Sequence, residues 1–191
     1  MTALDPLLVE ALGADLRSAG YTTDGVAELL GDDANAAMGR GVWWPALRAT
    51  AGGGRLATLV RLFLLGTDEP ADQVRAAFPS AGLAELAVAG VLEEVGDTVR
   101  AALDIRPHSD GERDFYVVSD QDAALRGGAV EHEHVLGIGG ASMSLARAVI
   151  RTPVQRALDL GTGCGIQALH LNGHCADIVG TDTNPRALTL A

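Results

Sequence analysis

The sequence of 191 residues contains no lysine, only two cysteines and few aromatic residues, and it has no long apolar run. A membrane-spanning helix needs about 20 consecutive apolar residues, so the sequence predicts no such span. Asp5 and Glu10 stand where a signal peptide would have a basic start, and two cysteines cannot build a disulfide scaffold. These absences favour a cytoplasmic protein.

The balance of charge excludes another class of function. The formal net charge is -11, so a polyanion would have to be held by a local basic patch against the mean field of the protein. Generic DNA binding is therefore not expected. An apolar content of 48% is ample for a packed core, so the chain is expected to fold rather than to be disordered.

The first part of the chain has the periodicity of several helices followed by a hairpin. Asp5 and Pro6 favour a helix start, and glycines at 20, 31 and 66 favour helix ends. Apolar segments over 91–95 and 99–105 flank Gly96-Asp97, which favours a tight turn. The expected helices span residues 6–19, 22–30, 33–38, 55–65, 69–78 and 81–89.

Helices followed by a hairpin are typical of a winged helix, so we expect a winged-helix-like module within residues 1 to about 106. With a polar connection over 108–113 and a buried strand over 115–118, this gives an α+β domain spanning residues 1–118. The segment 83–89 takes the place of the recognition helix, and Glu85, Glu93 and Glu94 would repel phosphate there.

The second domain is expected to span residues 119–191. A linker over 119–134, which contains Gly127-Gly128, precedes a helix that starts at Ser142 or Ser144 and ends near Ile150. The following pattern predicts a strand over 157–160, a helix over 166–171, a strand over 176–181 and a helix capped by Asn184-Pro185. Strand, helix, strand is the start of an α/β Rossmann-like domain.

A glycine-rich turn lies between the first of these strands and its helix. Glycines at positions 161, 163 and 165 would let a ligand approach the backbone, and Asp182, which follows the second strand, could accept hydrogen bonds from a ribose. A dinucleotide fingerprint would place its third glycine at Ile166 and would not normally place a carboxylate at Asp159. A carboxylate there suits a cationic ligand instead.

The segment LDLGTGCGIQAL resembles motif I of class I S-adenosylmethionine-dependent methyltransferases, and VGTDTNPRAL resembles their acidic second motif. The nearest resemblance is to the group that contains the release-factor glutamine methyltransferase and ribosomal RNA guanine methyltransferases. It covers about residues 135–191. The resemblance implies S-adenosylmethionine as cofactor and a protein glutamine or an RNA base nitrogen as methyl acceptor.

The resemblance also implies roles for individual residues. Asp159 and the backbone of Gly161, Gly163 and Gly165 would line the methionine end of the cofactor, and Asp182 would bind the ribose. The residues expected beside the adenosine are Thr183 and Asn184.

The resembling group carries an Asn-Pro-Pro-aromatic motif that positions the methyl acceptor, and this sequence has none. Asn184-Pro185 is followed by Arg186 and follows the second strand directly, so we interpret it as a helix cap. No catalytic residue is predicted. We therefore expect an enzyme in a longer form, and we expect the 191-residue chain to lack the substrate half, to be inactive alone and to be disordered or to aggregate beyond Leu160.

Other interpretations remain open. The glycine turn could hold another nucleotide or no ligand, and the chain could be a winged-helix interaction module with a structural βα tail. Such a module could contact RNA only through arginines away from its acidic face, although we favour a protein partner or packing on the second domain. The arginines concerned are Arg40, Arg48, Arg55 and Arg61.

Several weaker signals have a structural interpretation that we favour. Cys164 is expected to fill the turn rather than to act as a nucleophile, and Trp43 and Trp44 are expected to pack between helices rather than to stack on a base. The segment 137–144, GIGGASMS, is equally compatible with a cofactor contact and a plain helix entry. Two groups of residues contain potential metal ligands, but neither has the spacing of a zinc site, so no metal is predicted. The first group is Glu131, His132, Glu133 and His134. The second is His170, His174 and Cys175.

Overall fold

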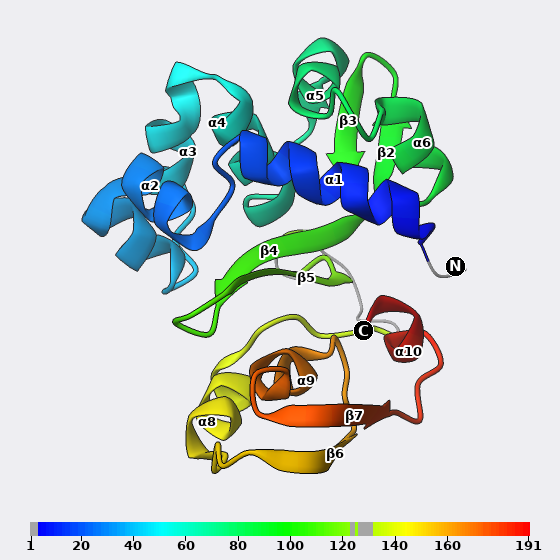
Figure 1. Cartoon of the computed structure of the whole chain (residues 1–191). Coiled ribbons are helices and arrows are strands. Elements are labelled where there is room, and N and C mark those ends of the chain that lie inside the picture. Colours follow the sequence, from blue (N-terminus) through cyan, green and yellow to red (C-terminus); the bar gives the residue numbers. More distant parts are fainter. Residues whose placement is uncertain (1–3, 123–124, 126–131) are drawn as a thin grey trace. The chain divides into compact units, whose positions relative to one another are not determined.

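A computed structural model describes residues 4–122, 125 and 132–191 of the chain. The chain divides into two compact units, Leu4–Tyr116 and, in its described part, a second unit within Val117–Ala191 (Figure 1). The architecture is α+β, with helices and small sheets. Within the described ranges, no helix is both long and apolar enough to cross a bilayer. The predicted Gly127-Gly128 linker lies outside the described residues.

The first two helices begin at the caps that the sequence predicts. In α1 (Pro6–Ser18) the Asp5 carboxylate accepts a hydrogen bond from the Leu7 N–H at 2.8 Å. In α2 (Thr23–Met38) the Thr22 hydroxyl accepts one from Gly25 N–H at 3.0 Å. Gly31, with φ of 70° and ψ of 167°, is not helical and divides α2 into two helical segments. The helix end predicted at Gly31 and the short helix predicted over 33–38 are therefore confirmed.

The central apolar helix of the first unit is present, and its last turn is wider than that of an α-helix. The unpredicted helix α3 (Trp44–Ala49) and the 3₁₀ turn η1 (Thr50–Gly52) precede it, and α4 (Arg55–Leu59) continues as the π-helix η2 (Val60–Leu64). The Phe63 ring lies 6.1 Å from that of Tyr21 and 6.2 Å from that of Phe78, centroid to centroid. The side chain of Phe63 is completely buried, so this helix lies at the centre of the core.

A small antiparallel sheet follows, in the order β1-β3-β2. Its strands β2 and β3 are labelled in Figure 1. Its strands are β1 (Glu69–Pro70), β2 (Leu92–Val95) and β3 (Thr98–Ala101), and β1 and β2 flank the helices α5 (Ala71–Ala77) and α6 (Leu83–Val88). Val95 lies opposite Thr98, which confirms the predicted turn at Gly96-Asp97. The helix predicted over 69–78 is present as α5, but it begins two residues later than predicted, because Glu69 and Pro70 pair with β3.

The single strand predicted over 99–105 is two strands. Ala102 interrupts it, because the N–H groups of Ala102 and Leu103 both turn to the carbonyl oxygen of Val91, at 2.9 and 3.4 Å. The strand β4 (Leu103–Ser109) then includes the first two residues of the polar connection expected over 108–113, and it forms a two-stranded sheet with β5 (Asp114–Asp120).

In the second unit, β6 (Val154–Leu160), α9 (Ile166–Leu171) and β7 (Cys175–Thr181) form the predicted strand-helix-strand unit. The two strands are parallel, with Leu160 opposite Thr181, so both end at the same edge. The short helix α10 (Ala187–Leu190) follows. Helix α8 (Gly140–Ala148) starts before the predicted Ser142 or Ser144, because Gly139 is its cap and the Ser142 hydroxyl accepts a hydrogen bond from Gly139 N–H.

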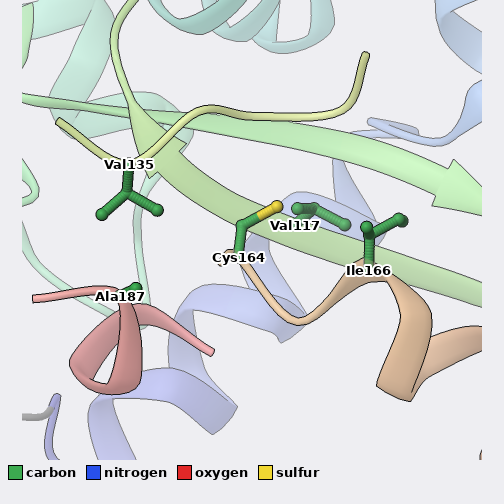
Figure 2. Packing of buried hydrophobic residues seen from close by; sticks show 5 residues of the cluster. All are labelled: Val117, Val135, Cys164, Ile166 and Ala187. Atoms are coloured by element: carbon green, nitrogen blue, oxygen red, sulfur yellow. The ribbon is translucent and has the colours of Figure 1, made fainter. Parts of the chain in front are cut away.

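A small apolar cluster holds these elements together (Figure 2). Its buried residues come from β5, the segment that precedes α8, the glycine turn, α9 and α10, and their side chains converge on one another. By contrast, the β6 side chains of Leu158 and Leu160 are 63% and 82% exposed. The cluster consists of Val117, Val135, Cys164, Ile166 and Ala187, with Ile138, Leu169 and Leu190 packed against it.

Candidate functional site

The glycine turn between β6 and α9 is fastened to the end of β7. The N–H groups of Gly161 and Thr162 both donate to the Thr181 carbonyl oxygen, at 2.8 and 2.9 Å. The N–H of Gly165 closes the turn on the Thr162 carbonyl oxygen at 2.9 Å. The turn therefore lies where the two parallel strands end, which is the edge at which open α/β sheets bind ligands.

Two of the three glycines leave open space beside the backbone. The φ angles of Gly161, Gly163 and Gly165 are 75°, 55° and 76°, values that side chains disfavour. A Cβ on Gly161 or Gly163 would meet no atom within 4 Å, whereas one on Gly165 would meet Ala191 at 3.4 Å. The first two glycines thus expose the backbone to a ligand, and the third allows close packing.

Asp159 lies inside the turn rather than on its surface. Its side chain is buried, and its Oδ2 accepts a hydrogen bond from the Thr162 hydroxyl at 2.7 Å. The Thr181 hydroxyl donates to the Asp159 carbonyl oxygen at 3.4 Å. The carboxylate therefore braces the turn and brings a negative charge to its inner side.

The structure brings Asp182 against the glycine turn. Asp182 Oδ2 accepts a hydrogen bond from Gly163 N–H, and its Oδ1 accepts one from Asn184 N–H, both at 2.9 Å. These N–H groups, Asn184 before Gly163, hold the pKa of Asp182 below its ordinary value, so the carboxylate is ionised at neutral pH. A carboxylate has about four acceptor positions, so each oxygen retains capacity for a ligand hydroxyl.

The two residues after Asp182 lead into α10. Thr183 is exposed. Asn184 Oδ1 accepts a hydrogen bond from Arg186 N–H at 3.0 Å, and Asn184 Nδ2 donates to the Glu133 carbonyl oxygen at 2.9 Å. Asn184-Pro185 thus turns the chain into the helix as predicted, although the helix begins at Ala187.

Sequence reasoning missed Asp120, which lies at the end of β5. Its carboxylate accepts hydrogen bonds from Val135 N–H at 2.8 Å and from Arg186 Nε at 3.1 Å, and Arg186 Nη2 makes a second, shorter contact. Burial raises the pKa of Asp120, but the hydrogen bonds from Arg186 and Val135 outweigh it and keep that pKa below its ordinary value. The only signal in the sequence was an acidic residue at a strand end.

The remaining polar candidates lie apart from the glycine turn or have other contacts. The Cys164 side chain packs in the apolar cluster. His170 Nδ1 lies 3.4 Å from Arg151 Nη2, and His134 Nδ1 lies 4.0 Å from Asp120 Oδ2. In the part of the chain that the structure describes, no three His, Cys, Asp or Glu side chains form a metal-binding group. Glu131, which belongs to the first of the two groups considered as metal ligands, lies outside the described residues.

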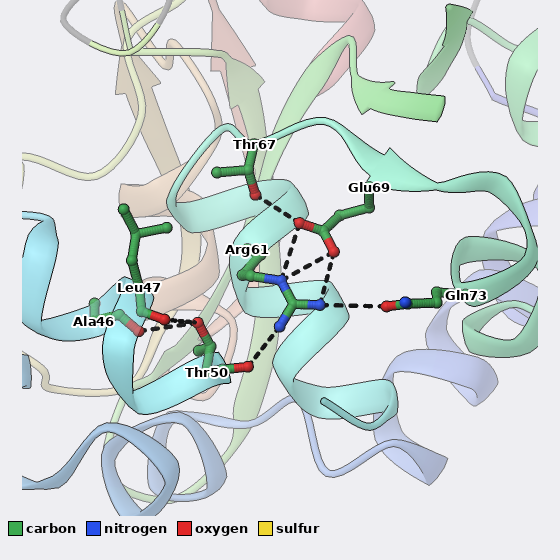
Figure 3. Close-up of polar contacts among 7 residues, drawn as sticks. All are labelled: Ala46, Leu47, Thr50, Arg61, Thr67, Glu69 and Gln73. Carbon is green, nitrogen blue, oxygen red and sulfur yellow. Dashed lines mark hydrogen bonds and ion pairs between the residues drawn. The ribbon is translucent and has the colours of Figure 1, made fainter. Parts of the chain in front are cut away.

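Two of the four arginines considered for RNA contact have partners inside the first unit. Arg61 Nε donates to both carboxylate oxygens of Glu69 at 2.9 Å, and its Nη1 donates to the Thr50 carbonyl oxygen (Figure 3). Arg55 Nη2 donates to the Ser18 hydroxyl at 3.0 Å and to the Ala77 carbonyl oxygen at 3.1 Å. These two side chains stabilise the fold.

The tryptophan prediction was half wrong. Trp43 is partly buried, but Trp44 at the start of α3 is 73% exposed and does not pack between helices. Arg40 and Arg48 are also exposed. The segment 137–144 contacts α9, because Gln167 Nε2 donates to the Ser142 carbonyl oxygen at 2.8 Å.

The first part of the chain is similar to a known protein-family model. Residues 18–102 match the model of a domain of unknown function, DUF7059. The matched residues lie within the first unit and exclude the glycine turn. No curated protein matches the chain significantly.

Proposed function

We propose that the second unit binds S-adenosylmethionine and that the protein is an N-methyltransferase acting on a protein glutamine or an RNA base nitrogen. One observation carries the binding proposal: the Asp182 carboxylate is hydrogen-bonded to the glycine turn at Gly163, where β6 and β7 both end. Backbone that a ligand can approach therefore lies next to an ionised carboxylate that can accept hydrogen bonds from hydroxyl groups. The methyl-transfer part rests on the resemblance of the two motifs.

The residues of the turn fit the chemistry of this cofactor. Asp182 would accept hydrogen bonds from the ribose hydroxyls with its remaining acceptor positions. The space beside Gly161 and Gly163 would admit the methionine part, and the buried charge of Asp159 would favour its cationic groups. Thr183 and Asn184 would lie beside the adenosine.

When bound, S-adenosylmethionine supplies an electrophilic methyl group. The contribution that we assign to this chain is to bind and orient the cofactor, since holding an electrophile in line with a nucleophile lowers the barrier to transfer. No residue of the chain is assigned to the methyl acceptor.

Disorder was expected beyond Leu160, but β7 pairs with β6 and the chain continues into α10. The test is therefore isothermal titration calorimetry of the 191-residue chain itself with S-adenosylmethionine and S-adenosylhomocysteine. We expect both to bind, and we expect Asp182→Ala to weaken binding at least about tenfold, because the variant removes the acceptor of the ribose hydroxyls. Asp177→Ala is the matched control, since Asp177 lies on β7 with an exposed side chain paired to Arg156. NAD and ATP are titrated in parallel.

Absence of binding to both ligands, or an affinity that Asp182→Ala leaves unchanged, would contradict the proposal. Stronger binding of NAD or ATP would favour the other nucleotide interpretations. Methyl transfer from labelled S-adenosylmethionine to a peptide or RNA by this chain alone is not expected.

The first unit supports a second proposal, a winged-helix-like module that contacts protein. The order of η2, β1, α5, α6, β2 and β3, with β3 between β1 and β2 in the sheet, supports this proposal because winged helices have a similar order. Glu93 and Glu94 on β2 are exposed, which disfavours phosphate. We expect no salt-dependent binding of a single-stranded RNA in fluorescence anisotropy. Binding that Arg40→Glu with Arg48→Glu abolishes would favour RNA instead.

A further inference from the structure

We propose that Asp120 and Arg186 form a clamp that positions the backbone segment Glu133–Val135 beside the candidate nucleotide site and so raises its affinity for the nucleoside. This inference rests on the proposed function. Asp120 and Arg186 are positioning residues, because they act on the site through the segment and through Asn184.

The clamp joins three parts of the second unit that are distant in the sequence. Asp120 ends β5, Val135 follows the linker, and Arg186 precedes α10. The Asp120 carboxylate binds Val135 through the backbone N–H, and it binds Arg186 through two guanidinium nitrogens. The Asp120 N–H donates in turn to the Val135 carbonyl oxygen at 3.1 Å. Val135 is therefore held on both its backbone polar groups.

The same segment contacts both sides of the candidate site. On one side, the Val135 side chain packs in the apolar cluster with Cys164 of the glycine turn (Figure 2). On the other, the Glu133 carbonyl oxygen accepts a hydrogen bond from Asn184 Nδ2, and Asn184 N–H donates to Asp182 Oδ1. The segment thus couples the turn to the ribose-binding carboxylate.

The surroundings of the clamp favour a strong effect. The side chains of Asp120 and Arg186 are only 15% and 27% exposed, so solvent screens their pairing less than that of a surface pair. A guanidinium that donates through two nitrogens also fixes the orientation of its partner. The pair Arg156–Asp177 in the same unit is 76% and 57% exposed and offers a matched control.

The test is a double-mutant cycle with Asp120→Ala, Arg186→Ala and the double variant, in which S-adenosylhomocysteine affinity is measured by calorimetry at a temperature where circular dichroism shows each variant folded. Each single variant should weaken binding about tenfold, and the double variant little more, because coupled residues are not additive. Asp120→Glu should restore much of the affinity, and Arg156→Ala should leave it unchanged.

Hydrogen exchange gives a readout that does not depend on the ligand. Peptides covering residues 132–138 should exchange faster in Asp120→Ala, while peptides of β6 and β7 keep their protection. If the wild-type chain binds S-adenosylhomocysteine and the clamp variants bind equally well, the clamp is overturned and the proposed function stands. If the wild-type chain does not bind, both fail.

Discussion

In the unit Leu4–Tyr116, large apolar side chains such as Phe63, Phe78 and Leu86 are almost completely buried. In the second unit, Leu158 and Leu160 on β6 are largely exposed, and the buried residues are mostly small or medium in size. The first unit therefore has an extensive core of its own. Among its described residues the second has a small cluster, and one member of it, Cys164, belongs to the glycine turn.

The difference shows two ways of using buried residues. In the first unit, the core and a buried ion pair stabilise a scaffold in which no ligand site is proposed. In the second, Val135, Cys164 and Ala187 belong to segments that also contain or contact the candidate site, so the cluster and the site are one structure. A substitution in the cluster should therefore affect ligand affinity and stability together, whereas one in the first core should affect stability alone.

Phe63→Ala should give the largest effect. The completely buried ring contacts Tyr21 and Phe78, so its loss should lower the free energy of unfolding by about 4 kcal/mol in urea denaturation. Val88→Ala, at a side chain 91% exposed, is the control. A folded Phe63→Ala protein that had lost S-adenosylhomocysteine binding would break the proposed contrast between the units.

Glu69→Ala should follow. It leaves the Arg61 guanidinium, whose side chain is 15% exposed, without its carboxylate, and should cost about 3 kcal/mol of unfolding free energy. The exposed pair Asp68–Arg100 is the control, and Asp68→Ala should cost less than about 1 kcal/mol. Equal effects in denaturant titrations would show that burial does not set the strength of these pairs.

Gly163→Ala should cost about 1 to 2 kcal/mol, because its φ of 55° is strained for a residue with a Cβ. We also expect weaker S-adenosylhomocysteine binding, since the methyl group would enter the open space at the turn. Gly140→Ala at the start of α8 is the control, because φ there is not positive and the space is also open. Unchanged binding in folded Gly163→Ala would argue against a ligand at this point.

Tyr21→Phe tests whether ionisation of a buried hydroxyl makes the stability of the first unit depend on pH. Burial, followed by the negative charge of Asp104, raises the pKa of Tyr21 well above its ordinary value of 10.0. The pKa of Tyr21 is therefore higher in the folded state than in the unfolded state. The neutral hydroxyl contributes its full stabilisation below pH 10.0, and this stabilisation is lost as the pH rises toward the folded-state pKa. At neutral pH, losing the hydrogen bond to the Ile105 carbonyl oxygen should cost about 1 kcal/mol.

Denaturation at a series of pH values above neutral checks this sign. Wild-type stability should fall more steeply than that of Tyr21→Phe in the alkaline range. Parallel curves would mean that the Tyr21 hydroxyl does not couple to folding.

The smallest effect on stability is expected from Leu158→Thr with Leu160→Thr. These side chains are 63% and 82% exposed, so the unfolding free energy should change by no more than about 0.5 kcal/mol. Exposed apolar strands favour association, so we expect the wild-type chain to self-associate in sedimentation velocity and the double variant to do so less. Val88→Thr in the first unit is the control. If the double variant self-associates as strongly as the wild-type chain, the exposed leucines of β6 are not the cause of self-association.

Local features of the sequence predicted most helices and turns. Asp5, Thr22 and Gly96-Asp97 act within a few residues of themselves, so a single sequence is enough to interpret them. The strand break at Ala102 and the pairing of Glu69 with β3 depend on distant partners, Val91 and Val99, which local periodicity cannot identify.

The candidate site likewise could be predicted where it depends on nearby residues, but not where it depends on residues distant in the sequence. The glycine turn and Asp182 could be placed at one sheet edge, because parallel strands joined by one helix must end together. The ion pair of Asp120 with Arg186 spans 66 positions of sequence, and nothing in either neighbourhood points to the other. The exposure of Trp44 also could not be predicted, because it depends on which face of α3 the rest of the first unit covers.

The two cysteines differ in a way that is useful for labelling. Cys164 is buried in the apolar cluster, whereas Cys175 is partly exposed at the start of β7, at the opposite end of that strand from Asp182. A maleimide dye should therefore modify Cys175 first and spare the glycine turn. The native chain thus provides one attachment point for a fluorophore that would report on β7 without occupying the site.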